Sequence, residues 1–323
     1  MDSNAKHIET LIVPRHELDG ALWNSFIAQS PQGANYAMTW YLDAVWPTWQ
    51  GILVFYKGKL QAVMPVRASS KFGISYCLQP WLCQYLGIFF ASMELKNEKA
   101  WALKKRLVTA VADTIPQNLK KVVLNFAPEF DYPLPFHWAG YELRTRYTYW
   151  LDHNPDKQLL FGNLNERTRT YINKAGRSGL TASNTGDVAG IIQLSREQEA
   201  YPLDYNVLGK LWAALQTNNA GRAIEVRDKE GRLHCGLLYH VSGQKQIHLF
   251  SALDPATKHL GGMSLAIWHS IEQAVDDIRI HDFEGSMLEP VEKFFRGFNT
   301  YPVPYLQIRK NTFPKPLRWM VED

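Results

Sequence analysis

The strongest constraint on the fold is an order of predicted elements that occurs twice along the chain. Segments 51–66 (GILVFYKGKLQAVMPV) and 223–241 (AIEVRDKEGRLHCGLLYHV) each contain two apolar strands joined by a turn with glycine. Helical sequence containing tryptophan precedes each hairpin, and an amphipathic helix and one more strand follow it. This order predicts an α/β (α+β) fold that is duplicated, with two mixed sheets each flanked by helices.

The later elements of the two halves suggest where the chain divides. The helices are expected at about 97–114 and 263–276, and the strands after them at 121–126 and 278–285. The periodicity breaks near 151–162, where Asn154-Pro155 and a polar run occur. We therefore expect one lobe over 1–153 and a second over 154–323.

Composition and charge exclude several classes of protein. With 46% hydrophobic residues, 20% charged residues and a net charge of +4, the chain is globular and can bind an anion, but nothing indicates DNA as a partner. The three cysteines form no CxxC pair, and the start of the chain lacks the pattern of a signal peptide. Apolar stretches are too short for a transmembrane segment. A cytoplasmic location is expected, with peripheral contact to a membrane left open.

Common catalytic and cofactor motifs do not occur in this sequence. There is no GxSxG, no GxxxxGK[ST] and no glycine-rich dinucleotide fingerprint after a first strand. His234, His240 and His248 fall on separate strands without metal-ligand spacing, so no metal site is expected.

A strand near the C-terminus ends in two carboxylates. Alternation places Ile278, Ile280, Asp282 and Glu284 on one face, directly before Gly285-Ser286. A short Phe-rich helix with Arg296 and a closing strand with Tyr305 follow. One interpretation is a carboxylate site at a strand tip. The alternative, favoured by the local pattern, is that Asp282 caps a neighbouring backbone and Glu284 pairs with Arg296.

Two further stretches could bind an anion. Gly261-Gly262 precedes a helix near Met263, where a close backbone approach and N–H groups suit a phosphate, although a plain tight turn is the alternative. On a helix over 163–180, Arg167, Tyr171 and Lys174 share a face, with Arg177 nearby. That face could hold a diphosphate or a carboxylate, or it could simply be solvated.

Taken together, these stretches resemble the FemAB-like branch of the GNAT fold. RTRTYINKAGRSGL (167–180) is similar to the family's basic helix, HDFEGS to its Asp-Phe-x-Gly strand end, and VEKFFRGFNTYPVPY to its Phe-Lys/Arg-x-Phe helix and closing strand. The hairpin at 223–241 and the helix LAIWHSIEQA also match, so the resemblance covers about 160–310 well and 35–150 more loosely. It implies a double GNAT-like fold, with the better-preserved motifs in the second lobe. It also implies transfer of an acyl group, often an aminoacyl group, to an amine.

The sequence departs from the family pattern in two places. No long heptad segment stands where Fem peptidyltransferases carry a helical arm. The stretch from His259 to Ser264 is an imperfect version of the loop that cradles the pyrophosphate of acetyl-CoA, and the first lobe has no glycine at the matching position. The resemblance therefore implies that any CoA site lies in the second lobe, at His259, Gly261, Gly262 and Ser264.

The resulting functional hypothesis is an acyl- or aminoacyltransferase that binds no cofactor permanently. Its donor would be acetyl-CoA or aminoacyl-tRNA, and its acceptor a small molecule or an envelope precursor such as a peptidoglycan precursor. Glu284 would assist deprotonation of the amine, Tyr305 would return a proton to the leaving group, and N–H groups of a splayed strand near 247–253 would stabilise the oxyanion. Substrate contacts would come from Arg167, Tyr171, Lys174, Arg177, Asp282 and Arg296. The alternatives are an acetyl-CoA-dependent N-acetyltransferase of a small amine or amino sugar, and an inactive GNAT-like module that binds an anionic metabolite or a protein partner.

Overall fold

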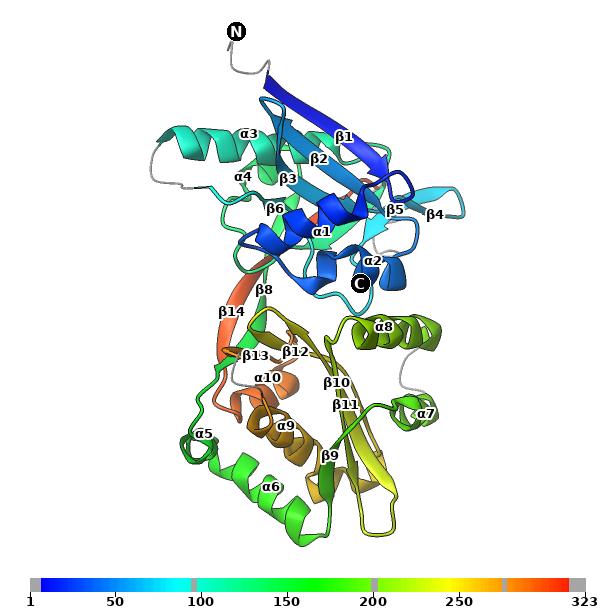
Figure 1. Cartoon of the computed structure of the whole chain (residues 1–323), viewed down its shortest axis with the longest axis vertical. Helices are drawn as coiled ribbons and strands as arrows, with labels where there is room; N and C mark the ends of the chain where they lie inside the picture. Colours follow the sequence, from blue (N-terminus) through cyan, green and yellow to red (C-terminus); the bar gives the residue numbers. More distant parts are fainter. Residues whose placement is uncertain (1–6, 94–97, 199–202, 275–277, 314–323) are drawn as a thin grey trace. The chain divides into compact units, whose positions relative to one another are not determined.

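A computed structural model of the chain describes residues 7–93, 98–198, 203–274 and 278–313. The chain divides into two compact units, one formed by Met1–Arg146 with Pro304–Asp323 and the other by Tyr147–Val303. Helices and strands alternate along both units (Figure 1), so the expected mixed α/β class is confirmed. The ends of the predicted helices at residue 97 and at 275–276 lie outside the described residues.

The first unit is built on the hairpin that the sequence predicts. Strands β2 and β3 pair with a turn at Lys57-Gly58, β1 pairs with β2, and β6 pairs with β3, all antiparallel. Helix α3 packs against β1, β2 and β3. The elements that lie wholly in this unit are β1 (Ile8–Pro14), α1 (Gly20–Gln29), η2 (Asn35–Ala37), α2 (Thr39–Val45), β2 (Gln50–Tyr56), β3 (Lys59–Val66), β4 (Ser69–Lys71), β5 (Ile74–Leu78), β6 (Phe89–Phe90), α3 (Glu98–Thr114), β7 (Lys121–Asn125) and α4 (Leu134–Trp138).

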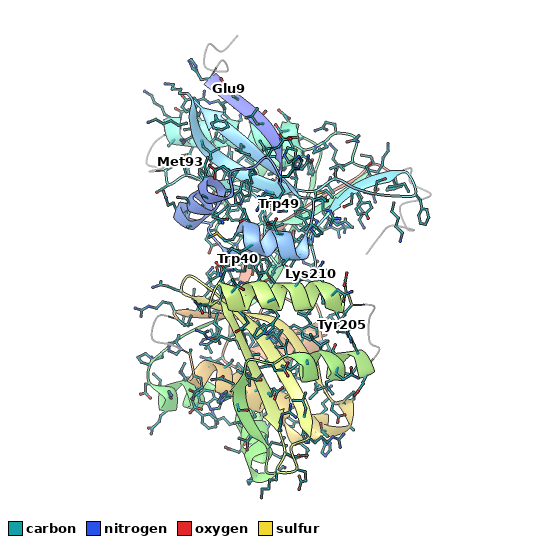
Figure 2. All side chains as sticks on the ribbon, turned by 45° about the vertical axis from the view of Figure 1, so that its right-hand side comes forward. Glu9, Trp40, Trp49, Met93, Tyr205 and Lys210 are labelled. Atoms are coloured by element: carbon teal, nitrogen blue, oxygen red, sulfur yellow. The ribbon has the colours of Figure 1, made fainter. Side chains whose placement is uncertain are left out.

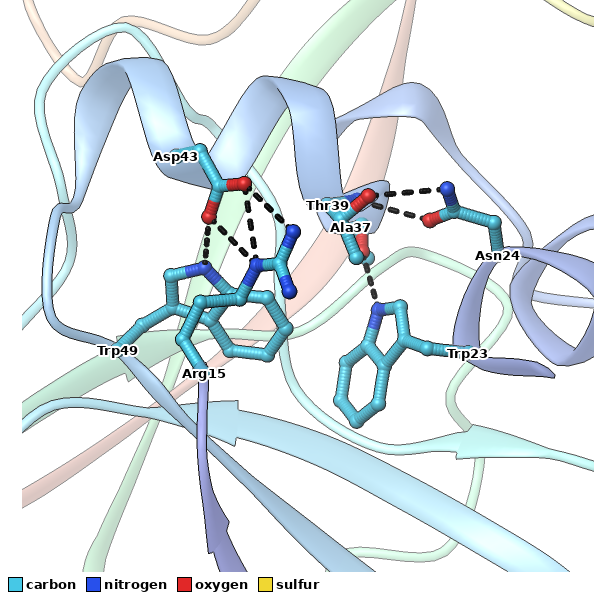
Figure 3. Close-up of polar contacts among 7 residues, drawn as sticks. All are labelled: Arg15, Trp23, Asn24, Ala37, Thr39, Asp43 and Trp49. Atoms are coloured by element: carbon cyan, nitrogen blue, oxygen red, sulfur yellow. Dashed lines mark hydrogen bonds and ion pairs between the residues drawn. The ribbon is translucent and has the colours of Figure 1, made fainter. Parts of the chain in front are cut away.

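Tryptophan and carboxylate contacts hold α1 and α2 to this sheet. The Asp43 carboxylate of α2 accepts hydrogen bonds from the Arg15 guanidinium at 2.9 Å and from the Trp49 indole N–H at 2.8 Å (Figure 3). The indole of Trp23 in α1 donates to the Ala37 carbonyl at 2.7 Å, and its side chain lies against Gly51 of β2. Trp23 and Trp49, which lie on either side of the predicted helical stretch 37–46, therefore have structural roles here.

The second unit repeats the order of elements in the first. Its hairpin β10–β11 is extended by β12, and helix α9 leads to β13, which pairs with β12 in parallel. Helix α9 packs on β9, β10 and β11, α7 packs on β11 and β12, and Figure 1 draws α7 and α9 on opposite sides of these strands. The elements that lie wholly in this unit are α5 (Lys157–Asn163), α6 (Glu166–Arg177), β9 (Thr181–Thr185), α7 (Ala189–Glu197), α8 (Tyr205–Thr217), β10 (Gly221–Arg227), β11 (Leu233–Ser242), β12 (Lys245–Leu253), η3 (Pro255–Leu260), α9 (Gly262–Glu272), β13 (Ile280–Asp282) and α10 (Glu289–Arg296).

Two long strands pass from one unit to the other and complete each sheet with sequence from the other half. Strand β8 (Glu142–Asp152) follows the first half, but its residues Trp150–Asp152 pair with β13 of the second unit. Strand β14 (Tyr301–Asn311) follows the second half, but Gln307–Asn311 pair with β7 of the first unit. The halves thus exchange their closing strands. For this reason the limits of the two compact units do not coincide with a single boundary between residues 153 and 154.

Candidate functional site

A gap between two parallel strands is the clearest candidate for a site in the second unit. Strands β12 and β13 pair only from Lys245↔Ile280 to Ile247↔Asp282. Beyond that point β12 continues to Leu253, and its pairing with β11 shifts register between Leu238 and Tyr239. Strand β13 ends at Asp282 and does not follow β12. Such a bulge bends a strand and increases its twist. The splayed strand expected near 247–253 is thus present.

The space between the parted strands is a pocket of about 270 Å³. Its walls are His248–Ser251 of β12, Phe283–Ser286 after β13, and Val291 and Phe295 of α10. The Phe-rich helix therefore forms one wall of the pocket, with Phe295 and Phe298 buried in the core. Phe294 of the same helix lies at the surface instead, since 36% of it is exposed.

Asp282 is a buried acceptor of three hydrogen bonds. Its carboxylate accepts from the Thr148 hydroxyl at 2.5 Å, from the Trp150 indole at 2.9 Å and from the Glu284 backbone N–H at 2.9 Å. Burial raises the pKa of this carboxyl, and the hydrogen bonds from Thr148 and Trp150 act in the opposite direction. The bond to the Glu284 N–H is the backbone cap that the structural interpretation of the sequence predicted.

Glu284 lies in a left-handed backbone conformation at the mouth of the pocket. Its φ of 53° is unusual for a residue with a side chain, and such conformations persist only where surrounding contacts enforce them. The predicted strand 278–285 is shorter than expected, because β13 ends at Asp282 and the turn at Glu284 breaks the alternation. The alternative interpretation pairs Glu284 with Arg296, and the Arg296 guanidinium donates a hydrogen bond to Glu292 one turn away at 2.8 Å.

His248 lines the pocket, although the sequence pattern indicated only an ordinary strand histidine. Burial lowers the pKa of this imidazole to about 4, against a weaker opposing hydrogen bond to the Phe250 backbone. At neutral pH the ring is therefore uncharged and can donate or accept one hydrogen bond at each nitrogen. Only the three-dimensional parting of β12 and β13 identifies it, because its sequence context is that of any strand histidine.

The basic helix α6 lies directly against the start of α9. A Cβ atom placed on Gly261, whose φ is 86°, would come within 2.5 Å of the Tyr171 carbonyl oxygen. Gly262 and Ser264 are also buried, whereas His259 is exposed. The structure thus brings the predicted basic face and the predicted glycine loop side by side, and close packing explains the glycine at position 261.

The side chains of α6 differ in exposure. Arg167 and Arg177 are exposed, and Tyr171 and Lys174 are half-buried. The Arg167 guanidinium lies 5.7 Å from the centre of the Tyr171 ring, a cation–π distance. Among the described residues, the ion pairs of the second unit do not include Arg167, Lys174 or Arg177.

Tyr305 belongs to the first unit, and it is not among the residues that line the pocket between β12 and β13. It is buried, its ring meets Tyr85 edge-on at 5.1 Å, and its hydroxyl accepts a hydrogen bond from the Arg146 guanidinium at 3.3 Å. The strand exchange explains this position, since β14 enters the first unit at Pro304.

The described residues contain neither a candidate metal cluster nor a helix that could span a membrane. No group of three or more His, Cys, Asp or Glu side chains in these residues is placed to hold a metal ion. In the same part of the chain, every helix is too short or too polar to cross a bilayer.

Comparison with known proteins gives a match in structure only. No family model matches the sequence, and no curated protein matches it significantly. FemX shares the fold with a TM-score of 0.65 at 13% identity, over 98% of this chain and 100% of that one. A tandem GNAT protein from the clavulanic acid biosynthesis pathway gives 0.57 at 10% identity, over 95% and 100%. A conserved protein of unknown function from Bacteroides thetaiotaomicron gives 0.51 at 10% identity, over 90% and 97%.

These similarities define the class of fold. The chain shares the fold of FemX and of a tandem GNAT protein, in line with the double GNAT-like fold that the resemblance in the sequence implied. Identities near 10% establish the fold, and the chemistry must be argued from the site itself.

Proposed function

We propose that the protein transfers an acyl group from an activated donor to an amine, using the pocket between β12 and β13. The observation that carries this proposal is the parting of two parallel strands inside a GNAT fold, with a carboxylate at the mouth of the opening. Strand edges that leave a ladder present backbone N–H groups to the space between them. Those groups can stabilise the oxyanion that forms when an amine attacks a carbonyl carbon.

Glu284 is the residue we assign to proton transfer. An attacking amine must lose a proton as its nitrogen forms the new bond to the carbonyl carbon, and the leaving thiolate or alkoxide must gain one. The Glu284 carboxylate lines the pocket and can accept the first proton, directly or through water. His248 stays neutral because burial lowers its pKa to about 4, so it suits a hydrogen-bonding role rather than that of a cation.

Other members of the hypothesis remain proposals. The Arg167, Tyr171, Lys174 and Arg177 face of α6, beside Gly261, would bind phosphates of the donor or acceptor. Asp282 would act by positioning Glu284 through its backbone bond. Tyr305, as proton donor to the leaving group, and Arg296, as a substrate contact, stay part of the proposal, although neither is among the residues that line this pocket.

Two donor classes fit the fold and are separated by experiment. A structure of the tandem GNAT protein without acetyl-CoA is among the similar folds, which makes acetyl-CoA one donor to test. The resemblance in the sequence gives aminoacyl-tRNA as the other. The acceptor would be a small amine or an envelope precursor. A cytoplasmic location suits the three cysteines, which are all buried free thiols.

The first test is calorimetric titration with acetyl-CoA, alongside deacylation assays with aminoacyl-tRNA. Saturable binding of acetyl-CoA that is lost in Gly262→Trp would favour acetyl transfer in the second unit. Turnover of aminoacyl-tRNA without CoA binding would favour aminoacyl transfer.

The Glu284→Gln variant then tests the mechanism. We expect its turnover to fall about 100-fold or more, because one general base is removed. Absence of turnover with both donors, or an active Glu284→Gln variant, would contradict this mechanism. Binding of an anion to α6 without turnover would instead support the inactive binding module.

A further inference from the structure

A second, larger pocket lies on the α7 side of the second unit. It has a volume of about 570 Å³ and lies between α7 and the ends of β10, β11 and β12. Gln193, Leu194 and Glu197 line it from one face of α7. Arg227 and Arg232 face them, with Asp254 beside Arg232. The transfer pocket uses β12 residues up to Ser251 and the α10 wall, so the two pockets share no lining residue.

Buried carboxylates hold both arginines of this pocket in place. Arg227 donates to Glu225 at 2.8 Å and to the Gly231 carbonyl at 2.8 Å, and the Glu225 side chain is only 12% exposed. Arg232 donates to Asp254 at 2.5 Å, and the Asp254 side chain is 13% exposed. A guanidinium has five N–H donors, so these bonds use only part of its capacity. The two cations are thus oriented in advance for a further acceptor.

An acceptor for a positive group comes from the end of α7, and a further donor comes from the residue after it. The exposed Glu197 carboxylate accepts one hydrogen bond from Gln193 at 2.9 Å through a single oxygen. Gln198 lines the same pocket, and its amide nitrogen is buried and has no hydrogen-bond partner in the part of the chain that the structure describes. A buried donor without a partner is costly in an empty pocket and is satisfied by a polar ligand.

The wall formed by α7 is anchored at two points. Ile191 packs so closely on β11 that a Cβ on Gly236 would lie 2.4 Å from it. At the other end the Ser195 hydroxyl is 3.0 Å from the hydroxyl of Tyr205, the first residue of α8 (Figure 2), and the Arg196 guanidinium lies 5.0 Å from that ring's centre. The distance between Glu197 and the arginines is therefore set by the fold.

We propose that this pocket binds a small zwitterion with a carboxylate and an ammonium group, such as an amino acid or a dipeptide. The carboxylate lies at Arg227 and Arg232, the ammonium at Glu197, and apolar groups contact Leu194 and Leu233. A polyphosphate would be repelled by the carboxylates of Glu197 and Asp254, and a simple cation would be repelled by the two arginines. The volume is within the range of small-molecule sites. The proposal is independent of the transfer reaction.

The test is calorimetric titration with three probes that share the alanyl-leucine framework and differ in the charges at their two ends. L-alanyl-L-leucine carries both charges, N-acetyl-L-alanyl-L-leucine lacks the ammonium, and L-alanyl-L-leucinamide lacks the carboxylate. We expect the dipeptide to bind with Kd of about 1 mM or tighter, and each modified probe to bind about tenfold more weakly.

Matched variants assign each charge to its partner. Glu197→Gln should weaken the dipeptide about tenfold and leave the acetylated probe unchanged. Arg232→Gln should also weaken binding of the dipeptide about tenfold, and it should leave binding of the amide probe unchanged. Arg222→Gln is the control, because this exposed arginine is on β10 outside the pocket. Glu197 is also exposed, so loss of binding in its variant cannot come from misfolding.

Several results would overturn the proposal. One is the absence of dipeptide binding at about 10 mM, tenfold above the expected Kd of about 1 mM. The others are equal binding of all three probes and full binding of the dipeptide by Glu197→Gln. Weaker dipeptide binding in Glu284→Gln would also overturn it, because the probe would then occupy the transfer pocket.

Discussion

At the scale of single residues, two acids that are neighbours in sequence have different environments. Asp282 is 1% exposed and is fully engaged by Thr148, Trp150 and the Glu284 N–H. Glu284 follows in a left-handed turn and lines a pocket. The backbone bond between them spans the turn in which Glu284 lies. Three consecutive residues thus contain one acid buried among hydrogen-bond donors and one acid that lines a pocket.

The strained turn leads to a prediction that separates stability from activity. Glu284→Gly should raise the free energy of unfolding by up to about 1 kcal/mol, because glycine adopts a φ of 53° without steric cost. Glu284→Gln should leave it nearly unchanged, because the backbone strain stays. Both variants should lose acyl transfer. Urea denaturation and the turnover assay check the pair, and equal stability of all three proteins would show that the turn is not strained.

A buried histidine leads to a prediction about pH. Burial and the neighbouring His153 lower the pKa of His281 to about 3, below the unfolded value of 6.5. The unfolded chain therefore binds a proton that the folded chain does not, so stability is full above pH 6.5 and is lost as pH falls below it. At pH 5.5 this one group should cost about 1.4 kcal/mol.

The measurement is urea denaturation at pH 7.5 and pH 5.5. His281→Gln should reduce the loss between these two values by about 1.4 kcal/mol. His16→Gln is the matched control, because the His16 side chain is 79% exposed. An unchanged loss in His281→Gln would mean that the proton binds elsewhere.

At the scale of elements, α6 packs against the start of α9 and against the residues that follow α10. The Asn165 side chain caps the first turn of this helix at the Thr168 N–H, and in the middle of the helix the Tyr171 carbonyl oxygen lies against Gly261. Asn165 also donates its backbone N–H to the Gly297 carbonyl after α10. One helix therefore contacts both α9 and the end of α10, and the glycine loop is as much a packing feature as a candidate phosphate site.

Two glycine substitutions test this packing. Gly261→Ala should lower the free energy of unfolding by about 2–4 kcal/mol, because its Cβ would meet the Tyr171 carbonyl oxygen and its φ is left-handed. Gly176→Ala in the same helix should raise it by about 0.5–1 kcal/mol, because nothing lies within 4 Å of its Cβ position. Thermal or urea denaturation gives both values. A tolerated Gly261→Ala would mean that α6 can move away from α9.

At the scale of the whole molecule, the exchange of β8 and β14 sets the limits of each folding unit. The second unit needs β8, because Trp150–Asp152 pair with β13 and Thr148 and Trp150 satisfy the buried Asp282. The first unit needs β14, because Gln307–Asn311 pair with β7. Neither half of the sequence contains all the strands of one unit.

Fragments with different limits test this exchange. The fragment 147–303 should unfold cooperatively in urea, because it is one compact unit and keeps Tyr147–Asp152 of β8, with the Thr148 and Trp150 donors to Asp282. The fragment 154–323 should not, because it lacks β8, which leaves the edge of β13 unpaired and removes the Thr148 and Trp150 hydrogen bonds to a buried carboxylate. Circular dichroism and urea titration measure both. Cooperative unfolding of 154–323 alone would show that the exchanged strand is dispensable.

The sequence by itself determined the elements, and the tertiary structure decided their partners. Both hairpins, α3, α9 and the strand positions follow from local periodicity and turn residues, which act over a few residues and can be read along the chain. The acids at the tip of β13 could be located in the same way. The donors to Asp282, the place of Tyr305 in the first unit and the parting of β12 from β13 could not. Each of these depends on which strands pair, and Thr148 and Asp282 are 134 residues apart. Pairing between distant strands is decided by the packing of the complete sheets, because a strand's own sequence specifies its faces but not its neighbour.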